Sequence, residues 1–514
     1  DHTVWAGLPR TLCDLAQGPG VEPMAKALRD AHDQIKAAQA AFPSFAKVAD
    51  HAAMAIAHLQ KAEAACTEPS AHNLRTRVQA KLGQLGHVLR LSLGVEARAR
   101  TGAAFIEAGS QTALTLESAP GAAQDMRARL SLPQGWTQDG DVLHVAPDAA
   151  PTAPYRPAYD PAAPDAPRLD IELVHEGAQI TVPLAFEVEP VVLPPARITL
   201  SPSKALLNTK AANRTLMLGV SDLSPASAGV ELDVPEGWHV APTQTGFAVT
   251  APRDVATGLY SIAARVNGAP AQSVRLIQHD HVAPTALARP AVATVGVFDV
   301  AVPESKVGYI GAGNDRVGHW LAEMGADVTP LSDTDLTREA ALSQFDAIVV
   351  GIFAMRFRPG LRAAVPALHR WTDAGGTLVT LYHRPWDNWD PDSTPPRRLE
   401  IGQPSLRWRV TDEAADVTQM CDNPILLGPN PITAADWDGW VKERGLYFAK
   451  SWDPAYTALL SLSDTGEAPL HGALLVADIG RGRHIHTSLI LHHQMEHLVP
   501  GAFRLMANFT AKRR

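Results

Sequence analysis

Histidine and glutamate recur near the C-terminus at a spacing that can bind zinc. The run His493-Gln-Met-Glu-His497 fits the pattern His-x-x-Glu-His, and further histidines precede it. In zinc enzymes such a motif lies on a long helix, and a third ligand comes from another element. Here Pro500 follows closely, which leaves little room for a helix around the motif. We therefore expect no metal site in this chain; His493, Glu496 and His497 are the residues that would form one.

Tryptophan is concentrated between residues 386 and 452, where charged residues are interleaved with it. Six of the 11 tryptophans fall in this segment. Sugar rings have apolar faces rimmed by hydroxyl groups, so stacking aromatic side chains flanked by hydrogen-bonding groups suit them. The alternative is that the tryptophans pack a long insertion onto the sheet. The candidate carbohydrate-binding residues are Trp386, Trp389, Trp437, Trp440 and Tyr447.

Two segments lie where a predicted parallel sheet would bind a ligand. Gly311-Ala-Gly-Asn-Asp315 follows a predicted strand, and backbone amides at a strand-to-helix turn can bind an anion. The glycine spacing is not that of a dinucleotide site, and Asp315 would repel a phosphate. Thr380-Leu-Tyr-His-Arg384 ends another predicted strand. The candidate ligand contacts at this edge are Gly311, Gly313, Asn314, His383 and Arg384.

The elements that must position these residues alternate between strand and helix from about residue 292. This rhythm predicts a parallel, doubly wound α/β domain over residues 292–514. A hairpin around Gly480-Arg-Gly482 and a closing helix at 502–510 complete it. The predicted strands are 306–310, 327–331, 347–352 and 377–382, and the predicted helices are 316–324, 337–344 and 361–374.

The N-terminal part predicts a different architecture. Residues 21–100 have apolar positions at three- and four-residue spacing and form a predicted helical bundle. Leu132-Pro-Gln-Gly-Trp136 recurs as Val234-Pro-Glu-Gly-Trp238 between alternating strand-like runs. This repeat predicts two β-sandwiches, at 101–189 and 190–285, in which Trp136 and Trp238 fill the core rather than bind a ligand. The proline-rich segment 146–167 predicts an extended loop.

Composition excludes several classes of partner. The 514 residues are 46% hydrophobic and 19% charged, which is typical of a multidomain globular protein. The net charge of −9 and the absence of a basic stripe argue against nucleic acid as a partner. No apolar run reaches the length needed to span a bilayer. The three cysteines form no disulfide framework, although Cys13 and Cys66 could bridge; free thiols are the alternative.

Four segments carry a resemblance to a known family. Ile277–Pro284, Lys306–Arg316, Phe345–Gly351 and Ile432–Phe448 resemble the C-terminal extension of bacterial PIG-L (LmbE-type) zinc de-N-acetylases. The last domain resembles the class I glutamine amidotransferase-like fold of ThuA-like domains, but it lacks the nucleophilic Cys of amidotransferases. The β-sandwiches resemble fibronectin-III and NEW3 domains. In the PIG-L family the chemistry resides in an N-terminal domain with an Ala-His-Pro-Asp-Asp motif, which does not occur here.

The resemblance implies an accessory, non-catalytic role. Residues 1–20 would then be a linker from a missing N-terminal catalytic domain, which would hold the zinc; this chain would carry no cofactor. The implied partners are that deacetylase domain, polysaccharide and envelope proteins, and the implied location is secreted, periplasmic or envelope-associated. Two alternatives stay open: a structural cell-envelope protein without enzyme activity, and an independent enzyme at the edge of the α/β domain.

Overall fold

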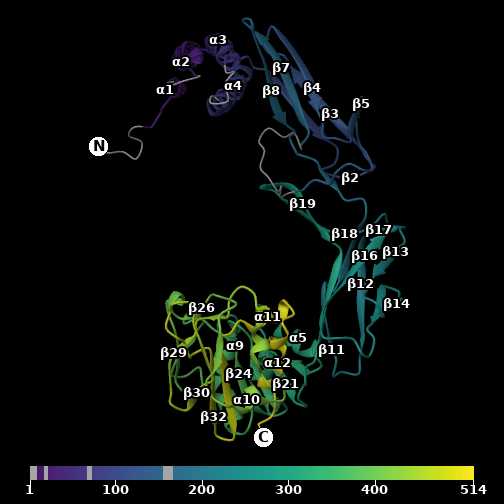
Figure 1. Cartoon of the computed structure of the whole chain (residues 1–514), viewed down its shortest axis with the longest axis vertical. Coiled ribbons are helices and arrows are strands. Elements are labelled where there is room, and N and C mark those ends of the chain that lie inside the picture. The colour runs from purple at the N-terminus through teal and green to yellow at the C-terminus, as the bar shows by residue number, and fades with distance from the viewer. Residues whose placement is uncertain (1–7, 17–20, 66–71, 154–165, 514) are drawn as a thin grey trace. The chain divides into compact units, whose positions relative to one another are not determined.

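The chain forms two compact units in the computed structural model, which describes residues 8–16, 21–65, 72–153 and 166–513 (Figure 1). Unit 1 comprises Asp1–Arg197, Ser224–Ala228 and Gln272–Pro290, and unit 2 comprises Ile198–Leu223, Gly229–Ala271 and Ala291–Arg514. Within the described ranges, no helix combines the length and the apolar character that a bilayer crossing requires. The predicted Cys13–Cys66 bridge and most of the proline-rich loop involve residues outside the described ranges.

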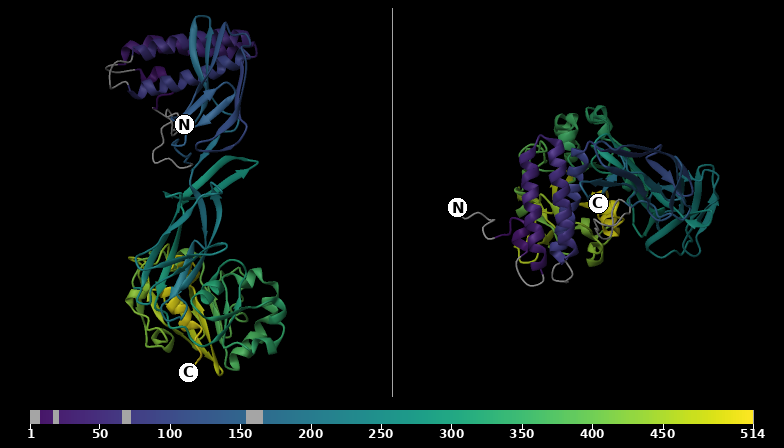
Figure 2. Two further views of the ribbon diagram at one scale, coloured as in Figure 1. Left: turned by 90° about the vertical axis from the view of Figure 1, so that its right-hand side faces the viewer. Right: turned by 90° about the horizontal axis from the view of Figure 1, so that it is seen from above.

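Unit 1 begins with helices, as the sequence predicts. They are α1 (Leu12–Leu15), α2 (Glu22–Ala41), α3 (Phe45–Ala64) and α4 (His72–Ser92), and the three long ones lie side by side (Figure 2). Helix α3 buries Ala49, Ala52, Ile56 and Leu59, whose spacing of three and four residues places them on one face. Small alanine side chains on that face allow the neighbouring helices to approach closely.

The rest of unit 1 is β-structure that shares a core with the helices. One sheet has the strand order β1-β3-β6-β5, another has the order β4-β7-β8, and β2 pairs with β9 in parallel. Trp136 is 8% exposed within this core, so its predicted packing role is confirmed. The strands are β1 (Glu96–Thr101), β2 (Phe105–Glu107), β3 (Gln111–Ala119), β4 (Asp125–Ser131), β5 (Trp136–Asp139), β6 (Val142–Val145), β7 (Arg168–His175), β8 (Ala178–Ala185), β9 (Val191–Leu193), β18 (Gln272–His279) and β19 (Val282–Pro290).

Unit 2 starts with a second group of strands. One sheet contains β14-β15-β12-β10 in that order, and another contains β11-β20-β16-β13 with β17 beside β16. Trp238 is 8% exposed, which confirms its predicted burial. Leu206 and Phe298 belong to the same core as the following α/β domain. The strands are β10 (Arg197–Ser201), β11 (Lys204–Asn208), β12 (Thr215–Ser224), β13 (Val230–Asp233), β14 (His239–Pro242), β15 (Gly246–Thr250), β16 (Gly258–Val266), β17 (Ala269–Pro270) and β20 (Val292–Phe298).

The α/β domain contains a seven-stranded sheet in the order β22-β21-β23-β24-β33-β32-β30. The first five of these strands are parallel, and β32 and β30 are antiparallel additions. The strands are β21 (Lys306–Ile310), β22 (Asp327–Pro330), β23 (Ala347–Val350), β24 (Thr377–Thr380), β30 (Tyr456–Ala458), β32 (Leu474–Ile479) and β33 (Gly482–Thr487). The helices are α5 (Val317–Glu323), α6 (Asp333–Leu336), α7 (Glu339–Leu342), α8 (Ala354–Phe357), α9 (Pro359–Asp373), α11 (Leu491–Glu496) and α12 (Pro500–Phe509).

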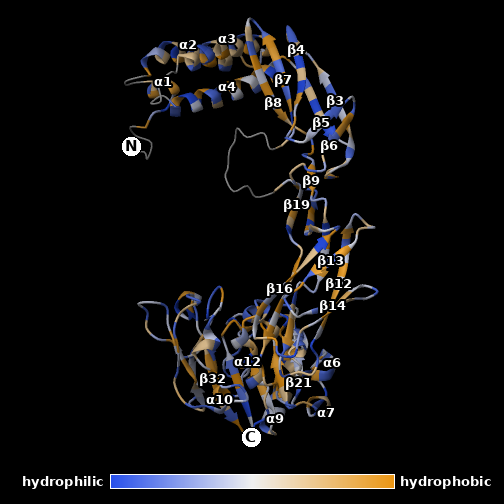
Figure 3. Cartoon of the chain, turned by 45° about the vertical axis from the view of Figure 1, so that its right-hand side comes forward, coloured by the Kyte–Doolittle hydropathy of each residue, from blue (hydrophilic) through white to orange (hydrophobic). Residues whose placement is uncertain are grey.

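Continuous apolar runs explain the central strands. All four residues of β23 are buried, as expected for a parallel strand that helices cover on both faces, and the colouring of Figure 3 shows this apolar centre. The predicted strands 306–310, 327–331, 347–352 and 377–382 correspond to β21, β22, β23 and β24. Within the predicted helix 337–344 only α7 is helical, and the short helix α6 precedes this range. Ser332 and Asp335 form a capping box that starts α6.

A long insertion separates β24 from β32. In it, β25 pairs with β29, β26 with β28, and β27 with β31, which gives three small two-stranded ribbons. The elements are β25 (Leu399–Ile401), β26 (Arg409–Val410), β27 (Val417–Gln419), the short helix α10 (Pro424–Leu427), β28 (Gly445–Leu446), β29 (Ala449–Trp452) and β31 (Leu460–Leu462). Buried Arg444 holds the insertion together: its guanidinium donates to the carbonyl oxygens of Ala415 and Trp437. These segments therefore pack onto the sheet as a folded part of the domain.

Candidate functional site

The carboxyl edge of the parallel sheet is where a doubly wound domain presents its ligand-binding loops. The loops after the five parallel strands reach this edge, and four of these loops are described below, those after β21, β23, β24 and β33. The predicted contacts Gly311, Gly313 and Asn314 lie in the first of these loops, and His383 and Arg384 lie in the third. Their surroundings differ, and only part of the edge remains available to a ligand.

The loop after β21 is closed by its own carboxylate. Asp315 Oδ1 accepts a hydrogen bond from the backbone N–H of Val317 at 2.9 Å and another from the Tyr309 hydroxyl. Its Oδ2 accepts the N–H of Ile352 at 2.9 Å. Burial, with the Asp315 charge beside it, raises the pKa of Tyr309 well above the usual range. The backbone amides of Val317 and Ile352, which an anion would need, are thus already bound to Asp315. Gly313 and Asn314 form an exposed turn beside them.

His383 is fully buried and does not face a ligand. Its Nδ1 donates to the carbonyl oxygen of Leu381 at 2.8 Å, so Nε2 is unprotonated and accepts the N–H of Met355 at 3.2 Å. Burial lowers its pKa to about 4. The cavity beside it measures about 20 Å³, enough for one water molecule but not for a larger ligand. The structure therefore removes His383 from the candidate ligand contacts and gives it a role in packing.

Two further histidines continue this buried network beneath the edge. Thr380 Oγ1 lies 2.9 Å from both His484 Nε2 and His486 Nδ1, and Tyr456 Oη lies 2.6 Å from His484 Nδ1. A hydroxyl has one proton, so at least one of the two rings must donate to Thr380. Burial lowers the pKa of both rings, to about 3 for His486. This network is a neutral, hydrogen-bonded part of the core.

Aromatic side chains gather at the ends of β23, β24 and β33. We call this group the edge cluster. The Tyr382 ring lies 5.2 Å from Phe353, 6.4 Å from Tyr447 and 5.6 Å from His492, measured between centroids. The Trp386 ring meets Tyr447 edge-on at 5.5 Å. The members of the edge cluster are Phe353, Tyr382, Arg384, Trp386, Tyr447 and His492.

Arg384 supplies the charge of the edge cluster. Its guanidinium carbon lies 4.1 Å from the Phe353 ring centroid and 5.6 Å from that of Trp386. The fully buried Asp387 accepts hydrogen bonds from Nε and Nη2 of Arg384. These bonds raise the pKa of Arg384. Arg356 approaches the same carboxylate at 3.8 Å. Two guanidinium groups thus share one carboxylate, next to an aromatic surface.

Backbone strain coincides with the edge cluster. Eight non-glycine residues of the described part have positive φ angles, and they include Phe353 (57°), Lys442 (77°) and Tyr447 (57°). Such conformations cost on the order of 1–3 kcal/mol each and persist where the surrounding structure requires them. Phe353 and Tyr447 are members of the cluster, and Lys442 pairs with Glu443 at 3.5 Å. This coincidence supports a functional role for the edge cluster.

His492 and Glu443 add ionisable groups to the same surroundings. Burial, together with His493, lowers the pKa of His492 to about 3, and its buried Nδ1 has no hydrogen-bond partner among the described residues. Burial and then the Glu443 charge raise the pKa of Tyr382 above its usual range. Phe353, Tyr382, Glu443 and His492 were not predicted from the sequence. The sequence pointed to two of them only indirectly: Phe353 directly follows the predicted strand 347–352, and Tyr382 is the last residue of the predicted strand 377–382.

Burial divides the predicted carbohydrate-binding residues. Trp386 is 51% exposed, whereas Trp389, Trp437 and Trp440 are 4–6% exposed. The Trp389 indole donates to the carbonyl oxygen of Leu399, and the Trp440 indole donates to the carbonyl oxygen of Asp436. These three rings cannot offer a face to a sugar, so the packing alternative holds for them. Trp386 and Tyr447 are the candidates that remain at the edge.

The His-x-x-Glu-His motif begins within α11, a helix of six residues, and ends at His497, which caps the helix C-terminus. Glu496 accepts Arg316 Nε at 2.8 Å and Nη2 at 2.6 Å, and its Oε1 also accepts the Trp320 indole N–H at 2.8 Å. Both carboxylate oxygens are therefore used by protein donors. The rings of His493 and His497 are tilted by 43° to each other, with centroids 4.3 Å apart. Within the described part of the chain they do not form a three-ligand group with Glu496.

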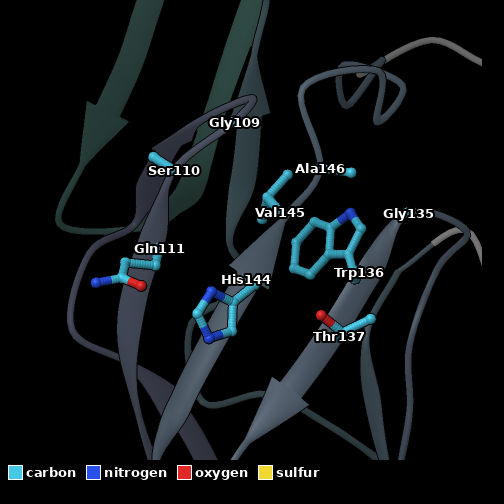
Figure 4. A pocket seen from close by; sticks show the side chains of 9 residues that line it. All are labelled: Gly109, Ser110, Gln111, Gly135, Trp136, Thr137, His144, Val145 and Ala146. Atoms are coloured by element: carbon cyan, nitrogen blue, oxygen red, sulfur yellow. The ribbon is translucent and has the colours of Figure 1, made fainter.

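A second hollow lies on unit 1 (Figure 4). It measures about 370 Å³, and a polar row of Gln111, His144 and Thr137 from three adjacent strands borders it. Trp136 also borders it, but the indole is only 8% exposed. The hollow exposes little aromatic surface on which a sugar ring could stack. The edge cluster is therefore the better candidate for a sugar-binding site.

Comparisons with known proteins give no family. No family model and no curated protein matches the chain. Similar solved structures include a GMP synthase component from Thermoplasma acidophilum (10% identity, 41% of this chain and 93% of that chain, TM-score 0.27). A ThuA-like protein from Bacteroides uniformis has 13% identity over 40% of this chain and 92% of that chain, with a TM-score of 0.25. The Bacteroides ovatus glucan-utilisation protein SGBP-B, solved with a mixed-linkage heptasaccharide, has 11% identity over 42% of this chain and 49% of that chain, with a TM-score of 0.13. All three TM-scores are below 0.5, so no argument about function rests on them.

Proposed function

We propose that the α/β domain is a carbohydrate-binding domain and that the edge cluster is its binding surface. The observation that carries the proposal is the half-exposed Trp386 indole, edge-on to Tyr447 and next to the Arg384–Asp387 pair. A sugar ring would stack on the indole, and its rim hydroxyls would reach the guanidinium group. The position at the carboxyl edge of a parallel sheet agrees with the place where such domains bind ligands.

The chain would then act as the accessory region of a larger enzyme. Its resemblance to the C-terminal extension of PIG-L-type deacetylases suggests that the enzyme removes acetyl groups from an N-acetylated sugar. The catalytic zinc would reside in a separate N-terminal domain, and the remaining domains of this chain would act as spacer and docking module. A secreted, periplasmic or envelope location fits a polysaccharide substrate. All of these statements rest on the resemblance of the quoted segments.

One observation favours a second candidate, an enzyme at the same edge. His492 has a buried nitrogen without a partner in the described part, and Glu443 has Lys442 as its ion-pair partner. The free imidazole nitrogen can accept a proton from a bound substrate, but its lowered pKa makes it a weak base. If this candidate is correct, His492→Gln reduces the turnover of a bound sugar far more than it weakens sugar binding.

Calorimetry with chitin oligomers tests the main proposal. We expect weak binding, on the order of 0.1–1 mM, because one exposed stacking platform and a few polar contacts supply little more than about 4–5 kcal/mol. Trp386→Ala removes the platform and should weaken binding by about 1–2 kcal/mol, or five- to thirtyfold. Phe45→Ala is the matched control, because Phe45 is 56% exposed and belongs to unit 1.

Two results would contradict the proposal. One is the absence of heat with the parent protein for chitin oligomers and for their deacetylated counterparts. The other is binding that Trp386→Ala leaves unchanged, because the sugar would then lie elsewhere. Retained binding in Phe45→Ala excludes a general effect of deleting an exposed aromatic ring.

A further inference from the structure

Outside the α/β domain, unit 1 holds a group of three metal-ligating side chains. Asp50, His175 and Glu176 each offer a donor atom, and these atoms all lie within 4.8 Å of one another, the one such group among the described residues. Asp50 lies on α3, His175 ends β7, and Glu176 begins the turn to β8. No spacing motif links them, because Asp50 and His175 are 125 residues apart.

Packing of the helix on the hairpin fixes the geometry of the group. Helix α3 contacts β7 and β8, and Gln60 donates to the carbonyl oxygen of Gln179 at 2.7 Å further along the same interface. Asp50 Oδ1 lies 3.1 Å from His175 Nε2. Ligands bound tetrahedrally to zinc at 2.0–2.2 Å are about 3.3 Å apart. This pair therefore already has nearly the separation of two zinc ligands, and only side-chain rotation has to bring in Glu176.

Charge around the group favours a cation. Among the described residues, neither Asp50 nor Glu176 forms an ion pair with Lys or Arg, and the partner of Asp50 is His175. The neutral amide of Gln124 holds Glu176: Gln124 Nε2 donates to Glu176 Oε1 and Glu176 N donates to Gln124 Oε1, both at 3.1 Å. Two carboxylates thus lie close together without a cationic side chain between them. A divalent ion would supply the missing charge.

His175 is placed as a ligand rather than as a surface residue. Its side chain is 12% exposed, and its Nδ1 is buried with no hydrogen-bond partner in the described part of the chain. A metal would bind through Nε2, the ring nitrogen that faces Asp50.

We propose that Asp50, His175 and Glu176 form a zinc-binding site. Magnesium and calcium prefer oxygen ligands alone, whereas one imidazole with two carboxylates suits zinc. Asp50 is 49% exposed and Glu176 lies at the surface, so water completes the coordination. The ion ties the bundle helix α3 to the β7–β8 hairpin and stabilises unit 1 in proportion to its occupancy.

Zinc titration of the full chain after treatment with a chelator tests this site. We expect one zinc ion per chain by calorimetry and elemental analysis, with an excess of magnesium unable to displace it. Asp50→Asn and Glu176→Gln keep the shape of exposed side chains, so folding should be unaffected, and each should weaken zinc binding about tenfold or more. The double variant His493→Gln/His497→Gln is the control and should bind zinc like the parent.

Thermal unfolding provides a second readout. Zinc should raise the midpoint of the unit 1 transition in the parent and in the control, and by less in Asp50→Asn at the same zinc concentration. The proposal is overturned if the parent binds no zinc. It is also overturned if Asp50→Asn and Glu176→Gln bind zinc as tightly as the parent, or if the His493/His497 variant is the one that loses the ion.

Discussion

Acidification should destabilise unit 2 through its buried histidines. His383, His484 and His486 are fully buried, and burial holds the pKa of each below its usual value of 6.5. The unfolded chain therefore takes up these protons at a higher pH than the folded chain does. This contribution to stability is fully present above pH 6.5, the unfolded value. It is lost as the pH falls toward the folded values, which are about 4 for His383 and about 3 for His486.

The magnitude follows from proton linkage. Between about pH 7.5 and about pH 5.5, a histidine that ionises only when unfolded lowers the free energy of unfolding by about 1.4 kcal/mol. The three buried rings together give a loss of about 4 kcal/mol, a large share of the stability of a typical domain. His486→Asn keeps a polar group near Thr380 but removes one titrating ring. The variant should therefore lose about 1.4 kcal/mol less than the parent over the same interval.

Urea unfolding followed by tryptophan fluorescence measures this effect, because most of the tryptophans belong to unit 2. His471→Asn, at an exposed position, is the control and should retain the full pH dependence. Proton linkage through the buried rings is refuted if the parent loses less than about 1 kcal/mol between the two pH values. An identical loss in His486→Asn and in the parent would refute it as well.

Two further predictions concern single positions in the fold. In α4, no atom lies within 4 Å of the place that a Cβ atom would take at Gly83, whereas at Gly86 such a carbon would lie 3.1 Å from Val182 Cγ2. Gly83→Ala should stabilise unit 1 by about 0.5–1 kcal/mol, and Gly86→Ala should be less stable than Gly83→Ala in parallel denaturant curves. Asp315→Asn replaces one accepting oxygen by an amide N–H₂, which would face the backbone N–H of Val317 or of Ile352. The free energy of unfolding of unit 2, measured in urea, should fall by about 2 kcal/mol. An unchanged unfolding midpoint would contradict the closed turn.

The α/β domain was largely predictable because short local sequence patterns mark its strands. The apolar run at 347–350 and the glycines at 375–376 mark a buried strand and a helix end without reference to other parts of the chain. The place of β33 was not predictable, because it pairs with β24 across about a hundred residues of insertion. Its parallel pairing brings His484 and His486 to Thr380, and no periodicity in the sequence indicates that contact.

The sequence indicated the type of the candidate site, but not which residues form it. Composition indicates an aromatic surface between residues 386 and 452, yet exposure depends on tertiary packing. Trp386 remains half exposed, while Trp437 and Trp440 pack around Arg444 in the core of the insertion. Asp50, His175 and Glu176 illustrate the same limit, because helix and hairpin packing brings them together. A search for metal motifs along the sequence finds only the histidines near the C-terminus.

Fluorine NMR of the chain labelled with fluorotryptophan tests the carbohydrate-binding surface most directly. The resonance of Trp386 is assigned by its loss in Trp386→Phe, and the labelled protein is then titrated with chitin oligomers. A sugar bound at the edge cluster should cause a saturable shift of the Trp386 resonance, while the resonances of the buried Trp437 and Trp440 stay in place. A Trp386 resonance that does not move at saturating sugar, or a shift confined to other tryptophans, would contradict it.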